Sequence, residues 1–455
     1  MIGKQIREIG NRAFPRISVN PTIKVSGEVE GVLINISEGG ICIATFESML
    51  LKKYSVNINF SGKNFSVPVE IIWCTKCEEG DEFLCGGRIF NVDKDTLTAM
   101  RRYMITKQFK YVVQDVKDRN KRRKVLKFAK DFRDYIFDLI DLRESVKRGI
   151  LSKEEIQKKV TKFSHSIVEE GEKLRVEIND EQLAQKIKES FRELVGAWVF
   201  KSKIMKRGLI KPKGYPGDYE TLEIIYNNEP LTDENCDLGR YFDVSFLNNP
   251  YAKAVRERKN KLKEIVENVL KERKSPIKIL NLACGACKEI RDICSNPSMN
   301  ITNKETFFYC LDWDKEALAF SKEELTNAPK NFHIEFIEDN VLNFIRRTRF
   351  YDENGKQDLI YSIGLADYFS DRIIKTMVKN AFHGLKCGGK FIIAHKDKDV
   401  SFSHIPPEWF CDWIFYQRNE KDLLNIIEDL KLDGLEIATD RDRTGDIFFY
   451  VLTKL

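Results

Sequence analysis

Two short segments in the second half of the chain hold the residues best suited to chemistry. Residues 278–289 form an apolar run that ends in the turn Ala-Cys-Gly-Ala-Cys, and residues 309–314 form a second apolar run closed by Asp312. In an α/β sheet, such a turn lets the backbone approach a ligand, and the acid after the next strand accepts hydrogen bonds from ribose hydroxyls. We therefore expect a nucleoside site here. A buried strand followed by an ordinary tight turn is the alternative.

The composition of the turn narrows the choice of nucleoside. It contains one glycine, Gly285, and it lacks the Gly-x-Gly-x-x-Gly pattern of pyrophosphate-binding turns. This argues against NAD and favours S-adenosylmethionine, which has no pyrophosphate. Strands that alternate with helical segments predict a Rossmann-like, doubly wound parallel sheet. These strands are expected at residues 277–282, 307–311, 334–337, 358–363 and 390–394.

The predicted cofactor site lies at the carboxyl ends of these strands, where open α/β sheets bind their ligands. Gly285 should approach the methionine part, Asp312 the ribose hydroxyls, and Asp339 or Asn340 the adenine amino group. We expect Asp312 to be an exposed carboxylate that contributes little to folding. The predicted cofactor-binding residues are Asn281, Ala283, Cys284, Gly285, Asp312, Trp313, Asp339, Asn340, Val341, Ser362, Gly364, Asp218 and Arg256.

More than half of the chain, from Pro212 onward, resembles a known enzyme family. The resemblance is carried by five blocks in the same order, at residues 213–220, 254–258, 281–289, 358–368 and 408–418. They resemble the S-adenosylmethionine-dependent methyltransferases known as 3-hydroxypalmitic acid methyl ester biosynthesis proteins. The resemblance implies ester formation on a fatty acid or a related small carboxylate. In two departures, Ala286-Cys287 replaces the usual Pro-Gly and Asn281 replaces the usual Asp.

The chemistry of methyl transfer indicates which side chains would matter. Displacement at a sulfonium mainly needs alignment and a dry cavity, and a carboxylate acceptor needs a positioned donor but no general base. With a hydroxyl or amine acceptor, His395 would serve as the base. Trp409 and Trp413 are expected in the core, with the wall of an apolar channel as the alternative. The proposed catalytic residues are Tyr215, Asp367, Tyr368 and His395. The further donors beside the blocks are Tyr219, Tyr361, Tyr416 and Arg418.

Two other motifs lie near the N-terminus. Residues 12–16 read Arg-x-x-x-Arg and residues 35–40 read Asn-x-Ser-x-x-Gly, set among alternating apolar strands. Arginine stacks on guanine and binds phosphate in a bidentate manner. The motifs resemble the PilZ domain, a bacterial receptor module for cyclic di-GMP, which implies a six-stranded β-barrel. One ligand per domain is expected, because Asn11 replaces the arginine that favours a ligand dimer. The implied ligand-binding residues are Arg12, Arg16, Asn35, Ser37, Gly39 and Gly40.

Apolar residues at heptad spacing follow the N-terminal strands and predict a long helix. They are Val125, Phe128, Phe132, Tyr135, Leu139, Leu142 and Val146. Later apolar sets supply partner helices for a bundle and a candidate homodimer surface. We expect a PilZ domain over residues 1–108, a helical bundle over 109–211 and a methyltransferase domain over 212–455. The last would comprise a lid over 212–275 and a Rossmann-like core over 276–455.

Composition excludes several other classes of function. The net charge of +6 in 455 residues does not indicate general nucleic-acid binding, and the basic run 117–124 is expected to be a solvated helix face. The 11 cysteines are odd in number and spread through apolar segments, which favours reduced thiols. Cys74-x-x-Cys77 lacks a second ligand pair, so no metal is predicted. No apolar run approaches the roughly 18 residues of a membrane span, and we expect a cytoplasmic protein.

These observations predict a multidomain enzyme in which cyclic di-GMP regulates an S-adenosylmethionine-dependent methyltransferase. Its partners would be cyclic di-GMP and a fatty acid-like acceptor. The main alternative is a catalytically degenerate methyltransferase fold that relays cyclic di-GMP to a protein partner, supported by the departures at 281 and 286–287. An RNA methyltransferase is a third reading, which predicts affinity that falls with salt.

Overall fold

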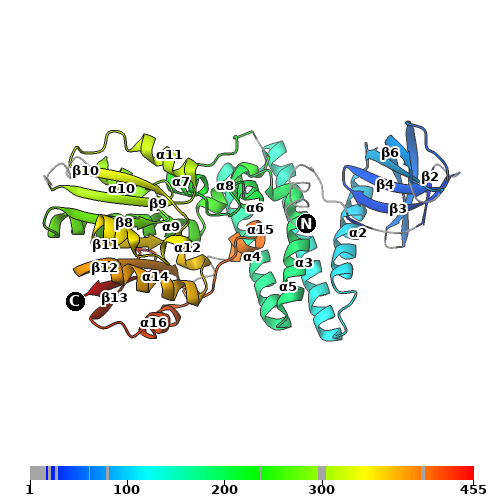
Figure 1. Cartoon of the computed structure of the whole chain (residues 1–455). Coiled ribbons are helices and arrows are strands. Elements are labelled where there is room, and N and C mark those ends of the chain that lie inside the picture. Colours follow the sequence, from blue (N-terminus) through cyan, green and yellow to red (C-terminus); the bar gives the residue numbers. More distant parts are fainter. Residues whose placement is uncertain are drawn as a thin grey trace. The chain divides into compact units, whose positions relative to one another are not determined.

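The computed structural model describes residues 17–18, 22–25, 29–60, 62–77, 81–235, 237–295, 304–400 and 405–455 (Figure 1). The chain divides into two compact units. The first comprises residues 1–206, 231–243 and 409–411. The second comprises residues 207–230, 244–408 and 412–455.

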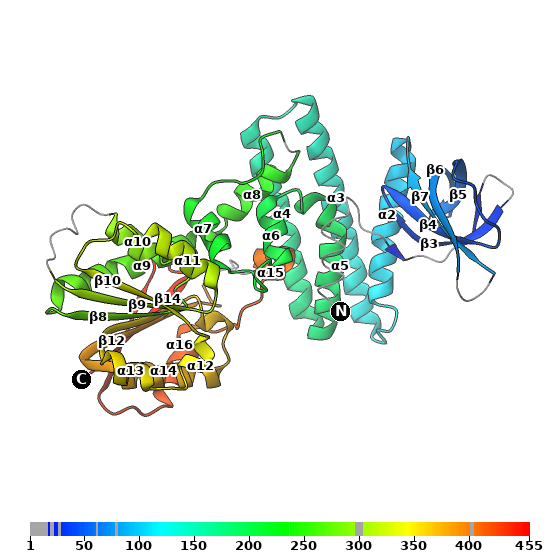
Figure 2. The same cartoon turned by 45° about the horizontal axis from the view of Figure 1, so that its top comes forward.

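The first unit begins with an antiparallel β-barrel. Its strands pair in the order β3-β2-β5-β6-β7-β4, and β4 pairs back with β3, so the described strands close a six-membered circuit. The two-residue strand β1 (Ile17–Ser18) extends the edge of β3. This pairing confirms the predicted six-stranded barrel; Figure 2 labels β3, β4, β5, β6 and β7 of it. The other strands are β2 (Thr22–Val25), β3 (Val29–Ser37), β4 (Gly40–Thr45), β5 (Lys53–Phe60), β6 (Lys63–Lys76) and β7 (Phe83–Ile89).

Helices follow the barrel in the same unit. They are α2 (Lys94–Val112), α3 (Arg119–Arg148), α4 (Lys153–Ile178) and α5 (Glu181–Val199). Because Asp93 caps α2, the helical region begins ahead of the predicted boundary at 109. The heptad residues of α3 are buried except for the half-buried Val146, as a bundle helix requires. The basic run at the start of α3 is largely exposed.

A tryptophan from far along the chain completes the core of the bundle. The Trp409 ring, in α15 (Ile405–Cys411), packs 5.7 Å from the Phe128 ring and 5.3 Å from the Phe191 ring. A Cβ atom at Gly171 would lie 2.4 Å from this indole, so only glycine leaves room for it. Trp409 is therefore a core residue, as expected.

The second unit is built on a seven-stranded sheet with the order β10-β9-β8-β11-β12-β14-β13. The first five strands in this order run parallel, and β14 pairs antiparallel with both of its neighbours. All five predicted strands are present. The strands are β8 (Ile277–Leu282), β9 (Thr306–Asp312), β10 (Phe332–Glu338), β11 (Gln357–Ile363), β12 (Leu385–Lys396), β13 (Leu435–Arg441) and β14 (Ile447–Lys454).

Two apolar cores cover the two faces of this sheet. Ile277 and Ile279 of β8 point into one core, and Leu280 and Leu282 point into the other. The helices of the first core are α9 (Pro250–Glu272), α10 (Lys288–Cys294) and α11 (Lys315–Glu324). Those of the second core are α12 (Val341–Phe344), α13 (Arg349–Asn354), α14 (Asp371–Gly384) and α16 (Glu420–Glu428). The doubly wound fold expected from the sequence is confirmed.

Four further short helices lie in the described part of the chain. They are α6 (Lys203–Ile210), α7 (Tyr219–Asn227), α8 (Gly239–Leu247) and the 3₁₀ helix η2 (Ala366–Tyr368). In the part of the chain that the structure describes, no helix combines the length and apolar character needed to cross a membrane. The same residues contain no group of three metal-binding side chains.

Candidate functional site

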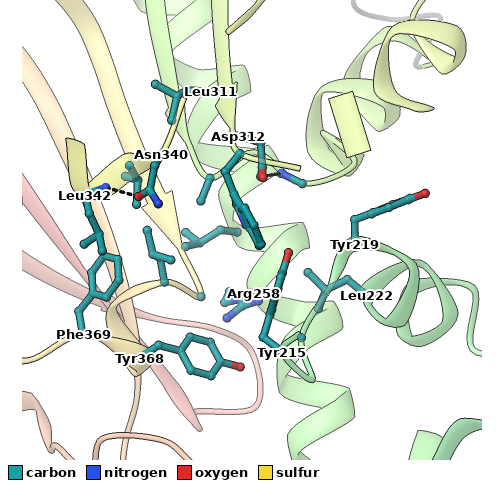
Figure 3. Close-up of a pocket in the computed structure, with 18 of the residues that line it drawn as sticks. Tyr215, Tyr219, Leu222, Arg258, Leu311, Asp312, Asn340, Leu342, Tyr368 and Phe369 are labelled. Carbon is teal, nitrogen blue, oxygen red and sulfur yellow. Dashed lines mark hydrogen bonds between the residues drawn. The ribbon is translucent and has the colours of Figure 1, made fainter. Parts of the chain in front are cut away.

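A cavity of about 370 Å³ lies at the carboxyl ends of the parallel strands in the second unit. Figure 3 shows the strand-end residues Asp312 and Asn340 on one side and Tyr215, Arg258 and Tyr368 on the other. Eight of the predicted cofactor-binding residues line it, so residues from separate strand ends meet as predicted. They are Ala283, Gly285, Asp312, Trp313, Asp339, Asn340, Val341 and Gly364.

The turn after β8 has an uncommon backbone. Ala283, Gly285 and Cys287 all have positive φ, at 59°, 52° and 48°. Residues other than glycine rarely adopt this conformation, and each such residue costs roughly 1–2 kcal/mol. Cys287 stands where the resembled family has glycine, so the departure noted in the sequence keeps the left-handed backbone at an energetic cost. A Cβ atom at Gly285 would meet only Tyr219, at 3.9 Å, which leaves the cavity side of the turn open.

Asp312 connects this turn to the end of β9. Its Oδ2 accepts a hydrogen bond from the Gly285 amide at 2.8 Å, and its Oδ1 accepts one from the Asp314 amide at 3.0 Å. The residue is only 6% exposed, and this burial raises the pKa of its carboxyl group. The expectation that Asp312 is exposed and irrelevant to folding is therefore wrong. It lines the cavity and also holds the turn in place.

The end of β10 supplies the next polar residues. The Asp339 amide donates to the Asp312 carbonyl at 3.1 Å, which places the two strand ends side by side. Asn340 caps α12, and its Oδ1 accepts a hydrogen bond from the Leu342 amide at 2.8 Å. Both residues lie at the cavity, at the position predicted for adenine recognition.

Aromatic side chains form the opposite wall. Trp413 Nε1 donates to the Tyr368 hydroxyl at 2.6 Å, and the Tyr251 ring lies 5.7 Å from the Trp413 ring. Burial raises the pKa of Tyr368 and of Tyr215, so both phenols stay neutral and can donate hydrogen bonds. Of the two tryptophans considered, Trp413 alone borders the cavity.

Arg258, in α9, is a cavity residue that the sequence reasoning missed. The prediction chose Arg256 from the same block, but that guanidinium donates to the carbonyls of Ile225 and Leu247, at 3.3 and 3.0 Å, and does not line the cavity. Residues two apart on a helix point in different directions. Arg258 follows the buried Tyr251 and Val255 at helical spacing, and this periodicity is the signal that identifies it.

Asn281 and Glu289 lie beneath the turn and outside the cavity lining. Asn281 Nδ2 and the Tyr361 hydroxyl both donate to Glu289 Oε1 at 2.8 Å. Burial raises the pKa of Glu289 to about 7. An aspartate at 281 would place a second carboxylate against this one, whereas the amide donates to it. This contact gives the replacement of the family's aspartate a structural reason.

Two more predicted residues next to the cavity are core groups. Ser362 is fully buried and Cys284 is 8% exposed, and neither lines the cavity. Burial raises the pKa of the Cys284 thiol well above its ordinary value, so it stays protonated at neutral pH. Both side chains therefore belong to the core around the sheet.

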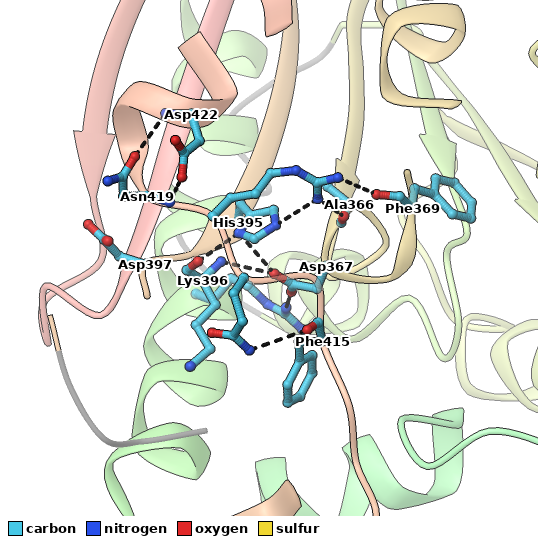
Figure 4. A network of polar contacts seen from close by, with 12 residues as sticks. Ala366, Asp367, Phe369, His395, Lys396, Asp397, Phe415, Asn419 and Asp422 are labelled. Carbon is cyan, nitrogen blue, oxygen red and sulfur yellow. Dashed lines mark hydrogen bonds and ion pairs between the residues drawn. The ribbon is translucent and has the colours of Figure 1, made fainter. Parts of the chain in front are cut away.

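His395 belongs to a buried polar network and does not line the cavity (Figure 4). Its Nδ1 lies 2.6 Å from the Lys396 carbonyl, and its Nε2 lies 3.3 Å from Arg418 NH1. The carbonyl requires a proton on Nδ1, so Nε2 accepts from the arginine. Both ring nitrogens are then occupied, which leaves His395 without a nitrogen for a substrate proton.

Asp367 belongs to the same network. Its Oδ1 accepts a hydrogen bond from the Lys396 amide at 3.0 Å and lies 3.3 Å from His395 Nδ1, while its Oδ2 lies 3.9 Å from Arg258. It is 2% exposed and is not among the lining residues. Among the proposed catalytic residues, only Tyr215 and Tyr368 face the cavity.

Asp218 does not line the cavity, but it caps a helix that does. Its Oδ1 accepts hydrogen bonds from the Thr221 amide and from Arg207, both at 2.8 Å, and it caps α7. This helix carries Tyr219 and Leu222, which line the cavity. Asp218 thus positions the wall without touching the cavity itself.

The predicted cyclic di-GMP site is described only in part, because Arg12 and Arg16 lie outside the described residues. The other four predicted residues lie in β3, β4 and the turn between them. Ser37 Oγ and the Gly40 amide form a hydrogen bond at 3.1 Å, which fixes the turn. Asn35 Oδ1 is buried and has no hydrogen-bond partner among the described residues.

Two protein-family models match parts of the chain. Residues 10–106 match the PilZ domain model, and residues 201–306 match the model of a family described as "Putative methyltransferase". These matches support an N-terminal PilZ domain followed by a putative methyltransferase domain. No curated protein sequence matches the chain.

Several solved structures match part of the chain. A possible exported protein from Bordetella parapertussis is 16% identical, with 55% of this chain and 86% of that chain covered and a TM-score of 0.41. Magnesium protoporphyrin IX methyltransferase from Synechocystis, solved with S-adenosylhomocysteine, is 13% identical over 45% and 86% of the two chains, with a TM-score of 0.33. An S-adenosylmethionine-dependent methyltransferase from Clostridium acetobutylicum is 14% identical over 45% and 95%, with a TM-score of 0.31.

Proposed function

We propose that this protein is a cyclic di-GMP-responsive, S-adenosylmethionine-dependent methyltransferase that esterifies a fatty acid or a related small carboxylate. The observation that carries the proposal is the cavity of the second unit. It combines a nucleoside-type strand-end wall, including Gly285 and Asp312, with a wall of neutral phenols. The PilZ match over residues 10–106 supports the cyclic di-GMP part of the proposal, and the putative methyltransferase match over residues 201–306 supports the methyltransferase part.

The residues present fit the cofactor. The left-handed turn at Gly285 is open on its cavity side, Asp312 would hold the ribose hydroxyls, and Asn340 would face the adenine. S-adenosylmethionine would supply an electrophilic methyl group. The protein's own contribution would be to align the acceptor with that group and to exclude water, because the displacement needs little acid–base catalysis.

The cavity suits a carboxylate acceptor with an apolar chain. Leu222, Leu342, Leu365 and Phe369 supply apolar surface, while Tyr215 and Tyr368 supply neutral donors. A carboxylate is ionised near neutral pH and can attack without a general base. None of the described residues that line the cavity is a histidine, which favours this acceptor over a hydroxyl or an amine.

The direct test is calorimetry followed by methyl transfer. S-adenosylmethionine and S-adenosylhomocysteine should bind the full chain at a ratio of one to one. With a radiolabelled methyl donor, saturated and 3-hydroxylated fatty acids should yield volatile or extractable methyl esters. A protein that binds neither cofactor form would instead support the degenerate alternative, which the strained residues Ala283 and Cys287 favour.

Regulation by cyclic di-GMP is tested at the N-terminal motif. If Arg12 and Arg16 bind guanine and phosphate, Arg16→Ala should lose roughly 1.5–3 kcal/mol, or about tenfold to a hundredfold in affinity. Lys63→Ala, an exposed charge on the same barrel, is the matched control and should bind normally. Unchanged affinity in Arg16→Ala would contradict the assignment.

Coupling between the two ligands can be measured in the same protein. Because linkage is reciprocal, cyclic di-GMP and S-adenosylhomocysteine must change each other's affinity by one common factor, which is roughly 5–150 for typical couplings. Each ligand is titrated with and without saturating amounts of the other. Affinities that do not respond would mean that the PilZ domain tethers or localises the enzyme without gating its site.

A further inference from the structure

Arg258 is a buried cation that lacks a close counter-ion. Its side chain is 5% exposed, and its Nε is buried without a hydrogen-bond partner among the described residues. The ion pair that it forms with Asp367 spans 3.9 Å, which is too long for a hydrogen bond. The guanidinium nevertheless lines the cavity (Figure 3).

The other buried arginine among the described residues of this unit is satisfied by the protein. Arg418, also 5% exposed, donates to the carbonyls of Ala366 and Phe369 and to the carboxylate of Asp371. Burying a charge is costly unless it is paired and hydrogen-bonded. Arg258 differs from Arg418 because it has a hydrogen bond with the neutral Tyr226, a long contact with Asp367 and an unpartnered Nε, and this difference favours a further partner from outside the chain.

Apart from Asp367, the side chains around Arg258 are neutral phenols. Tyr226, Tyr251 and Tyr368 are its neighbours, and burial raises the pKa of each phenol, so all three are uncharged. Gly364, at the end of β11, has φ of 82°, and a Cβ atom there would lie 2.6 Å from Arg258 NH1. Glycine at 364 therefore allows the guanidinium to lie directly against the strand end.

We propose that Arg258 binds a carboxylate group inside this cavity. A guanidinium presents parallel N–H groups that match the two oxygens of a carboxylate. Arg258 is the only cationic residue among the described residues that line the cavity, so it can balance one negative charge, as a carboxylate requires. A phosphate would bring more charge than this lining can balance.

Two carboxylates fit the proposed function, on which this inference rests. One belongs to the methionine part of the cofactor, and the other to the fatty acid-like acceptor. Either carboxylate would bind Arg258 in the same way. Three ligands distinguish them: one carries the cofactor carboxylate, one carries the acceptor carboxylate, and one carries no carboxylate. S-adenosylhomocysteine carries the first, decanoate the second, and 5′-methylthioadenosine is a nucleoside with neither.

The experiment measures these three ligands by calorimetry on the full chain. The variants are Arg258→Gln, Arg258→Lys and, as a matched control, Lys263→Gln, which removes a charge paired with Glu267 on the same helix. Decanoate is titrated both with and without saturating S-adenosylhomocysteine. If Arg258 binds the cofactor carboxylate, Arg258→Gln loses about tenfold to a hundredfold for S-adenosylhomocysteine and nothing for 5′-methylthioadenosine. If Arg258 binds the carboxylate of the acceptor, Arg258→Gln loses affinity by this factor for decanoate and keeps its affinity for the other two ligands.

Stability provides an independent readout. Arg258→Gln removes a buried charge but also takes an ion-pair partner from the buried Asp367, so its thermal midpoint without ligand should not exceed that of the wild type. Arg258→Lys keeps the charge but loses the bidentate geometry, and it should show an intermediate affinity. A folded Arg258→Gln protein with wild-type affinity for all three ligands would overturn the proposal, as would loss of 5′-methylthioadenosine binding in parallel with S-adenosylhomocysteine.

The same data separate this inference from the proposed function. If neither adenosine compound binds the wild type, the proposed cofactor is wrong, and decanoate binding by wild type and Arg258→Gln then decides on Arg258 alone. If the adenosine compounds bind but no variant changes any carboxylate-dependent affinity, the cofactor assignment stands and the role of Arg258 is rejected.

Discussion

Glu38 and Arg101 form a bidentate ion pair, in which Nε and NH2 of the arginine donate to the two carboxylate oxygens at 2.6 and 2.8 Å. Glu38 lies within the Asn-x-Ser-x-x-Gly turn of the PilZ barrel, and Arg101 lies on α2. The Arg101 guanidinium is 6.0 Å from the Trp198 ring of α5, which also has Arg143 of α3 at 4.6 Å. The predicted ligand turn is thereby connected to the helices of the first unit.

The first prediction concerns the stability contributed by this pair. The side chains of Glu38 and Arg101 are 12% and 6% exposed, so Glu38→Ala leaves a charge buried without its partner. We expect a loss of about 3–5 kcal/mol in the free energy of unfolding of the first unit, measured by urea denaturation. Asp81→Ala, which removes one partner of an exposed pair with Lys76, should cost less than about 1 kcal/mol. If Glu38→Ala and Asp81→Ala both lose less than about 1 kcal/mol, the Glu38–Arg101 pair contributes little to stability.

Sequence patterns predict the two sheets well because strand alternation and apolar runs are local properties. The six-stranded barrel and the five parallel strands are both present, but β13 and β14 were missed. β14 is a buried strand with an almost continuous apolar run, and β13 is a largely exposed edge strand without clear alternation. Turn residues do precede both strands, with Asp433-Gly434 before β13 and Gly445-Asp446 before β14, so this signal could have found them.

The site was harder to predict than the fold, since burial and side-chain direction depend on tertiary contacts. Strand-end residues such as Asp312 and Asn340 line the cavity, because sheet topology alone brings them together. The difference between Arg256 and Arg258 depends on the rotation of α9, and the network around His395 joins residues from three separate segments. No local pattern contains that information.

The second prediction concerns Asp312. Asp312→Asn keeps the size of the side chain but replaces one acceptor oxygen by a donor that faces a backbone amide. We expect weaker binding of S-adenosylmethionine and a loss of about 1–3 kcal/mol in stability, because one of the Gly285 and Asp314 amides loses its acceptor. Calorimetry and urea denaturation measure the two effects. Glu338→Gln, a half-exposed carboxylate at the end of β10, should show neither.

The third prediction concerns the backbone of the cofactor turn. Ala283 has φ of 59°, which glycine adopts without strain, so Ala283→Gly should relieve the cost of the left-handed conformation. Glycine also has a larger unfolded-state entropy, so we expect a net gain of about 0.5–1 kcal/mol at most. The adjacent Ala286 is not among the residues with positive φ, and Ala286→Gly should give no gain. Greater destabilisation by Ala283→Gly than by Ala286→Gly would show that the turn is not strained at 283.

The last prediction concerns the pH dependence caused by Glu289. Burial raises its pKa from an ordinary value of 4.5 to about 7. Between these values the folded protein holds a proton that the unfolded chain releases, so the stabilising contribution is complete below pH 4.5 and is lost as the pH rises towards 7. The loss should total about 3 kcal/mol, because each tenfold difference in proton affinity between the folded and unfolded chain corresponds to roughly 1.4 kcal/mol.

Glu289→Gln tests this directly because its amide stays neutral and its oxygen can still accept from Asn281 and Tyr361. Urea denaturation at pH 5 and pH 8 gives the change in unfolding free energy for each protein, and contributions from other groups cancel between them. The wild type should lose more stability than Glu289→Gln over this interval. Glu436→Gln, at an exposed position on β13, should behave like the wild type. If all three proteins show the same pH dependence, Glu289 is ionised in the folded protein throughout this interval, and its pKa is not raised.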